Sequence, residues 1–110
     1  MLEDNKEIAK IFKALCDENR VKIVKLLQGG EKCACDIGET LGLSQSKLSY
    51  HMKILCDSKI IECWYVGKWT HYQINTEGST SAVSILQNLT QVNPAQNNFT
   101  CTSNCTQKTI

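Results

Sequence analysis

The sequence predicts a mainly α-helical fold with one small β-hairpin, the winged helix-turn-helix, in the order α-α-α-α-β-β-α. Three observations lead to this prediction. Apolar residues recur at helical spacing in the first half of the chain. Two of the helical segments are joined by a short turn that contains Gly42, and the second of them has a polar face without acidic side chains. The pattern then changes to two strand-like segments joined by Gly67-Lys68.

The first two helices are predicted from amphipathic periodicity. Residues 5–16 place apolar side chains at i, i+3, i+4 and i+7, namely Ile8, Ile11, Phe12 and Leu15. Asp17 is a good N-cap for a second helix that ends at Gly29-Gly30. The inner face of this second helix is expected to contain Val21, Val24 and Leu27, flanked by Ile23 and Leu26. Both helices should contribute to the core.

A third helix should start near Cys33–Cys35 and stop at Gly42, and a recognition helix should follow from Ser44 to about Asp57. The buried face of the recognition helix is predicted from Leu48, Met52 and Leu55. Short hydrogen-bonding side chains and lysines on the opposite face suit a DNA major groove. The predicted DNA-binding residues are Ser44, Gln45, Ser46, Lys47, Ser49, Tyr50, His51, Lys53 and, from the wing, Lys68. An ordinary solvated helix surface is the alternative, and the helix-turn-helix context favours DNA.

Residues 60–66 and 69–75 are rich in β-branched and aromatic side chains, which predicts the wing hairpin with Lys68 at its tip. Residues 77–91 have helical spacing of apolar side chains, and this fifth helix either pairs with the first across a twofold axis or packs on its own domain. We therefore predict a winged-helix DNA-binding and dimerisation domain over residues 1–91. Residues 92–110 change to Asn, Thr and Gln, which predicts a disordered tail that contains cysteines.

The bulk composition excludes several classes. The chain has 110 residues, 42% of them hydrophobic, which suits one globular domain. It shows no apolar run of bilayer length and no secretory signal, so we expect a cytoplasmic protein without a membrane partner. The net charge is only +1, but residues 44–75 carry four lysines and two acidic residues, whereas residues 31–43 carry one lysine and three acidic residues. No phosphate loop and no catalytic base near a cysteine are present, so an enzyme is not expected.

Seven cysteines are many for a reduced compartment, and they favour metal or redox chemistry over a disulfide framework. Cys33 and Cys35 stand at the start of the third helix, where thiolates would select soft ions. In a regular helix the side chains at i and i+2 point about 200° apart. Metal binding should therefore unwind the first turn, or require that it is already frayed. Cys16 and Cys56 are expected to be small buried hydrophobes, and Cys63 to be structural.

Residues 31–55, EKCACDIGETLGLSQSKLSYHMKIL, resemble the metal(loid)-sensing ArsR/SmtB repressors, as do residues 67–75, GKWTHYQIN, and residues 15–27, LCDENRVKIVKLL. The resemblance covers residues 5–90 and points to the arsenic-responsive branch. It implies a winged-helix homodimer that binds double-stranded operator DNA, represses a resistance operon and leaves the DNA when the inducer As(III) or Sb(III) binds cysteine thiolates. No permanent cofactor is implied.

The Cys-x-Cys-Asp motif of that branch matches Cys33, Cys35 and Asp36, but the usual third cysteine downstream is absent. Cys101 or Cys105 is the candidate third ligand. We expect Asp36 to stabilise the helix dipole rather than bind the ion. The fifth helix has no histidine and one acid, Glu77, which excludes the His-carboxylate site of some relatives. Two alternatives remain: the same fold sensing Cd(II), Pb(II) or Bi(III), and a repressor that responds to thiol redox chemistry or persulfide.

Overall fold

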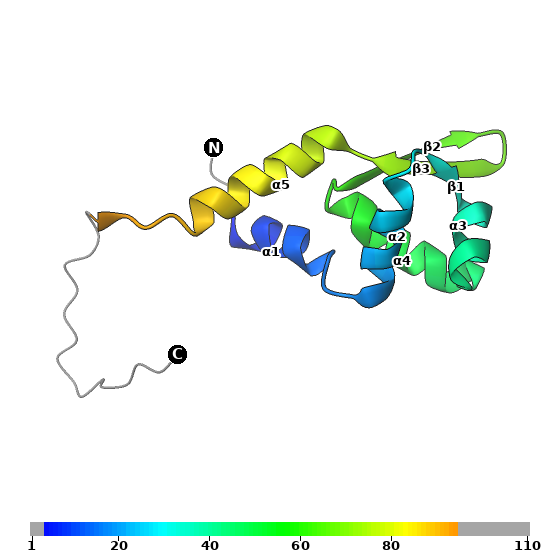
Figure 1. The fold of residues 1–110 in the computed structure, drawn as a ribbon, viewed down its shortest axis with the longest axis horizontal. Coiled ribbons are helices and arrows are strands. Elements are labelled where there is room, and N and C mark those ends of the chain that lie inside the picture. Colours follow the sequence, from blue (N-terminus) through cyan, green and yellow to red (C-terminus); the bar gives the residue numbers. More distant parts are fainter. Residues whose placement is uncertain (1–3, 95–110) are drawn as a thin grey trace, which may run out of the picture.

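The computed structural model describes residues 4–94, and its elements follow the predicted order with one addition. They are α1 (Asn5–Lys13), α2 (Glu18–Leu27), β1 (Lys32–Cys33), α3 (Ala34–Leu41), α4 (Gln45–Asp57), β2 (Ile61–Val66), β3 (Trp69–Ile74) and α5 (Thr76–Leu89). The predicted winged helix-turn-helix is confirmed, with α3 and α4 as its two helices and the β2–β3 hairpin as its wing (Figure 1).

The helix boundaries follow from capping residues that the sequence displays. The Asp17 carboxylate accepts from the backbone N–H of Asn19 at 2.7 Å, which caps α2. The Ser44 hydroxyl accepts from the backbone N–H of Lys47 at 3.2 Å, which caps α4. Gly42 ends α3 with φ 68°, a left-handed conformation that glycine adopts without steric cost. All three predicted boundaries are confirmed.

The sheet has three antiparallel strands in the order β1-β3-β2, so the prediction of a two-stranded hairpin was incomplete. The added strand, β1, pairs Lys32 with Tyr72 and Cys33 with His71 on β3. Two residues are too short to show the alternation by which a strand is recognised. The hairpin itself is as predicted, since Val66 pairs with Trp69 and Gly67 supplies φ 64° in the two-residue loop.

The core lies between α2, α3, α4 and the start of β2, where the largest fully buried side chains are Ile23, Ile37, Met52, Leu55 and Ile61. Each of the two predicted apolar stripes contains one residue that is exposed, Val21 on α2 and Leu15 after α1. Val21 is 38% exposed because α2 turns Arg20, Ile23 and Leu27 inward. Helix α1 ends at Lys13 and holds no fully buried residue, and Leu15 beyond it is 42% exposed.

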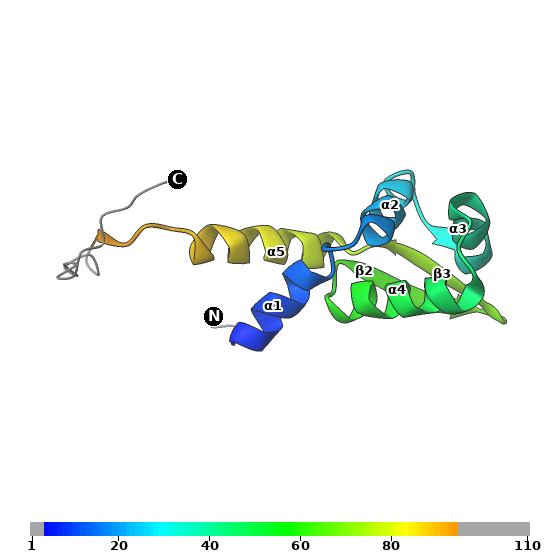
Figure 2. The ribbon, with the colours of Figure 1, turned by 90° about the horizontal axis from the view of Figure 1, so that it is seen from below.

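Helices α1 and α5 occupy the end of the molecule away from the wing (Figures 1 and 2). Apolar side chains of α5 remain exposed in the single chain, with Val83 at 56%, Leu86 at 46% and Leu89 at 57%. Within residues 4–94, no helix combines the length and apolar character needed to cross a bilayer.

Candidate metal centre and nucleic-acid interface

Two sulfur atoms meet at the start of α3. The Cys33 and Cys35 Sγ atoms are 3.3 Å apart, and one ligand atom from each of Cys33, Cys35 and Asp36 lies within 4.8 Å of the others. Cys35 and Asp36 are exposed and Cys33 is partly buried, so the group is open to solvent. Among residues 4–94, this is the one cluster of three such side chains placed to hold an ion.

The backbone explains how two cysteines at i and i+2 can meet. Cys33 is the N-cap of α3 and has an extended conformation, φ −85° and ψ 159°, whereas Cys35 lies in the first helical turn. The 200° separation of a regular helix therefore does not apply to this pair. Our expectation that an ion must unwind the first turn, or find it already frayed, is corrected, because the N-cap geometry brings the sulfurs together in an intact helix.

The close thiol pair affects its own ionisation. A hydrogen bond with Cys33 raises the pKa of the Cys35 thiol above its ordinary value, and desolvation and the negative charges of Cys33 and Asp36 act in the same direction. Two thiolates 3.3 Å apart would repel each other. A positively charged or electron-poor ligand that bonds to both sulfurs would relieve that repulsion.

The thiol centre is connected to the wing by strand pairing between β1 and β3. Cys33 is itself a β1 residue, and its partner on β3 is His71. The His71 imidazole stacks on Trp64 of β2 with ring centroids 5.8 Å apart, and its Nδ1 donates to the Glu31 carboxylate at 2.9 Å. This connection from the thiols to the wing was missed in the sequence, because it depends on the strand β1.

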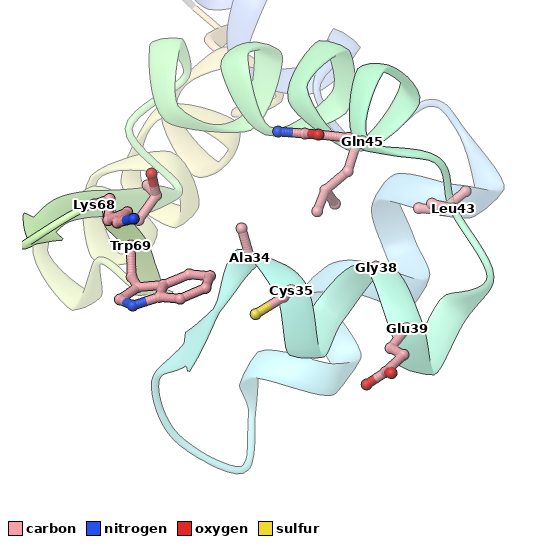
Figure 3. Close-up of a pocket in the computed structure, with 10 residues that line it drawn as sticks. Ala34, Cys35, Gly38, Glu39, Leu43, Gln45, Lys68 and Trp69 are labelled. Atoms are coloured by element: carbon pink, nitrogen blue, oxygen red, sulfur yellow. The ribbon is translucent and has the colours of Figure 1, made fainter.

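The centre is also close to the recognition helix, α4. The α3–α4 turn and α4 pack closely on Gly38 of α3, where a Cβ atom would stand 3.3 Å from the Leu43 carbonyl oxygen and 3.6 Å from Leu48 Cδ2. A cavity of about 520 Å³ lies beside the turn and contains Cys35 on its wall. Figure 3 shows the Cys35 sulfur and the Trp69 ring facing this cavity from α3 and the wing, with Gln45 of α4 opposite.

The polar face of α4 is exposed as predicted. Its exposed residues are Gln45, Ser46, Lys47, Ser49, Tyr50 and Lys53, preceded by the exposed N-cap Ser44, and Lys68 is exposed at the wing tip. Lys53 Nζ lies 3.3 Å from the Asp57 carboxylate. Because this ion pair is exposed, a DNA phosphate can replace the carboxylate as the partner of Lys53 at a small cost in free energy. The face therefore offers hydrogen-bonding groups and cations to a groove.

His51 does not belong to this face, and its prediction as a DNA contact is corrected. Its side chain is 5% exposed, and its Nδ1 accepts a hydrogen bond from Arg20 Nη1 at 3.0 Å. Arg20, also 5% exposed, donates further to the carbonyl oxygens of Ala14 at 2.9 Å and Lys13 at 3.3 Å. The Arg20–His51 hydrogen bond thus connects α4 to the turn after α1. Because the two residues are 31 positions apart, no local pattern in the sequence indicates this contact.

The other cysteines agree with expectation only in part. Cys16 and Cys63 are exposed, whereas Cys56 is half-buried, so only Cys56 resembles the small buried hydrophobe that we predicted. Cys101 and Cys105, the candidate third ligands, lie outside the described residues.

Comparison with known proteins gives a consistent result. The family model described as bacterial regulatory protein, arsR family, matches residues 17–62. The chain is 46% identical to an arsenical resistance operon repressor of Bacillus subtilis over 60% of this chain, a region that spans 64% of that relative. It is 38% identical to the arsenical resistance operon repressor of Staphylococcus aureus over 87% of this chain and 89% of that relative.

A solved structure supports the fold. The homodimeric winged helix-turn-helix DNA-binding domain of a possible ArsR-family regulator from Mycobacterium bovis matches with a TM-score of 0.63 at 21% identity. The match covers 84% of this chain and 93% of that one.

Proposed function

Because the chain belongs to the arsR family of bacterial regulatory proteins, we propose that it is a transcriptional repressor of a metal(loid) resistance operon. It binds double-stranded operator DNA as a homodimer and leaves the DNA when As(III) or Sb(III) bonds to Cys33 and Cys35. The 3.3 Å separation of the two sulfurs at the start of the helix before α4 carries this proposal.

The separation of the sulfurs favours a pyramidal ion. With metal–sulfur bonds of about 2.3 Å, two sulfurs 3.3 Å apart subtend about 90° at the ion. This angle suits a trivalent arsenic atom that carries a lone pair better than the wider angle of a tetrahedral ion. The third position falls to Cys101 or Cys105, to water, or to Asp36, which we expected only to stabilise the helix dipole but which has a carboxylate oxygen within 4.8 Å of both sulfurs. A four-sulfur site for Cd(II), Pb(II) or Bi(III) has fewer ligands to draw on in residues 4–94, where the cluster holds two sulfurs and one carboxylate.

Release of DNA follows from two mechanical connections. One runs from Gly38 of α3, which packs closely on Leu43 and Leu48, to the recognition helix, and the other runs through β1 to the wing strand β3. An ion that bonds to both thiolates and draws in a third ligand shifts Cys33 and the start of α3 relative to both DNA-contacting elements. Linkage requires that DNA weakens inducer binding by the same factor, and a ~100-fold release corresponds to roughly 2.7 kcal/mol of coupling per dimer.

The dimer interface is proposed for α5 and α1. Val83, Leu86 and Leu89 are exposed apolar side chains of α5, which lies with α1 at the end away from the wing (Figure 1), and Leu15 directly after α1 is exposed as well. A twofold axis there would bury these side chains and leave both recognition helices outward.

The test is a titration of operator release. The reduced full-length protein is bound to labelled promoter DNA from upstream of its own gene, and fluorescence anisotropy follows release by arsenite, cadmium or peroxide. We expect release by arsenite at the lowest concentration. Cys33→Ser and Cys35→Ser should keep DNA affinity and lose release, whereas the control Cys16→Ser should behave as wild type. Normal release by the Cys33 and Cys35 variants would contradict the proposal, and release by cadmium or peroxide alone would favour one of the alternative inducers.

A further inference from the structure

A second thiol pair lies between the recognition helix and the wing. Cys56 is in the last turn of α4, and Cys63 is on β2. Both line one cavity of about 340 Å³. The remaining lining residues are Ser49, Met52, Lys53, Asp57, Tyr65, Thr70 and Tyr72. The two cysteines belong to different elements that both contact DNA in the proposed function.

The pKa values of two side chains that line this cavity show that its titratable groups interact. Burial raises the pKa of the Cys56 thiol to about 12, with the negative charge of Cys63 and a hydrogen bond between the two side chains adding to the effect. Burial also raises the pKa of Tyr72 to about 12, and the charges of Cys56 and Cys63 contribute. The two sulfurs therefore share one environment, in which burial disfavours the Cys56 thiolate.

We propose that Cys56 and Cys63 form a second ligand site, which takes a trivalent arsenical that carries one organic substituent. Such a compound needs two sulfurs, and two are what the cavity offers. No third ligand joins this pair, since the one three-residue cluster found in residues 4–94 is at the start of α3. The Asp57 carboxylate on the cavity wall is already 3.3 Å from Lys53 Nζ.

The shape of the cavity distinguishes the organic arsenical from a bare ion. A single ion would leave most of 340 Å³ empty, whereas an organic group can fill it against Met52, Tyr65 and Tyr72. Methionine and aromatic rings give such a group an apolar and polarisable surface.

The binding step is balanced without an oxidant. A monosubstituted arsenical with two hydroxyl groups reacts with two thiols, two As–S bonds form, and two As–O bonds break. Each thiol proton leaves with one hydroxyl as water, and arsenic stays trivalent. The step thus removes both thiol protons while never forming two free thiolates in the cavity.

Occupation of this site should also affect DNA binding, a consequence that rests on the proposed function. Ser49 and Lys53 on the cavity wall are part of the exposed face of α4, and Thr70 comes from the wing. A ligand bonded to both cysteines joins α4 to β2 and places its organic group between two DNA-contacting elements. We expect DNA affinity to fall about tenfold, within the range of typical coupling between two sites.

The test isolates this pair in the full-length protein. Cys33, Cys35, Cys101 and Cys105 are changed to serine, and the reduced protein is incubated with an equimolar amount of phenylarsine oxide. Intact mass spectrometry should show one phenylarsenic group per chain. Adding Cys63→Ser, an exposed position that should not disturb folding, should abolish the adduct, whereas adding Cys16→Ser should preserve it. No adduct, or an adduct that survives Cys63→Ser, would overturn the proposal.

The anisotropy assay on the same variants separates the two proposals. A protein that binds DNA but takes no phenylarsenic group refutes the second site alone. A protein that takes the group but never binds promoter DNA refutes the proposed function and leaves the site standing. Retained DNA affinity in the adduct would overturn the link between this cavity and the DNA-binding face.

Discussion

Arg20 should be one of the most sensitive positions for stability, although its side chain is charged. We consider Arg20→Leu, which keeps aliphatic volume in the core and removes the guanidinium. The substitution removes the donor for three hydrogen bonds, to His51 Nδ1 and to the carbonyl oxygens of Ala14 and Lys13. All three acceptors lie at a buried or partly buried contact, where water replaces a lost donor poorly.

The magnitude follows from the number and kind of these bonds. A hydrogen bond that involves a charged group contributes about 1.5–3 kcal/mol, but bonds within one network do not add fully. Removing one member of a buried charged network costs about 3–5 kcal/mol. We expect Arg20→Leu to lower the free energy of unfolding by this amount, which corresponds to a fall in Tm of about 12 °C or more for a domain of this size.

The assay is urea denaturation followed by circular dichroism at one fixed protein concentration, because the proposed dimer would contribute to the measured stability. Lys22→Leu on the exposed side of the same helix is the control and should change stability by no more than about 0.5 kcal/mol. A cycle with His51→Leu measures the pairwise term directly. A loss below about 1 kcal/mol for Arg20→Leu would refute the argument that this guanidinium connects α1, α2 and α4.

Four further results are expected. Gly78→Ala should destabilise the fold by about 3 kcal/mol or displace α5, because the new Cβ would overlap the backbone carbonyl of Lys59, and denaturation with a dimerisation measurement detects either effect. Asp17 accepts backbone hydrogen bonds, chiefly from the N–H of Asn19, and these lower the pKa of its carboxyl below 3.8. The contribution of Asp17 to stability should therefore be complete above pH 3.8 and disappear as the pH falls through the lowered pKa. Asp17→Asn should reduce this pH dependence in acid denaturation. Because its neighbour thiol raises the pKa of Cys35, the rate of arsenite capture in stopped-flow measurements should increase as the pH rises from about 7 to 9, and a flat profile would contradict that. Lys68→Ala should weaken DNA binding about equally for all sequences and lower the salt slope by about one, whereas a change in sequence preference would argue against a phosphate contact.

Local patterns in the sequence were sufficient for the helices, the wing and the thiol motif. A cap such as Asp17 or Ser44 acts on backbone groups two or three residues away, and a hairpin turn such as Gly67-Lys68 needs only adjacent strands. These interactions are short-range, so their residue types stand close together in the chain and can be recognised there. The same is true of Cys33 and Cys35, because their Cys-x-Cys spacing is itself a local pattern of the chain.

Contacts between distant segments required the tertiary structure. The strand β1 exists because Cys33 pairs with His71 on β3, and the same extended residue lets its sulfur meet that of Cys35. The burial of His51 depends on Arg20, and the approach of Cys56 to Cys63 depends on how α4 packs on β2. The sequence by itself determined which side chains are available and which elements they form. Packing between elements far apart in the chain decided which of those side chains face each other, because that choice depends on the burial of all of them together.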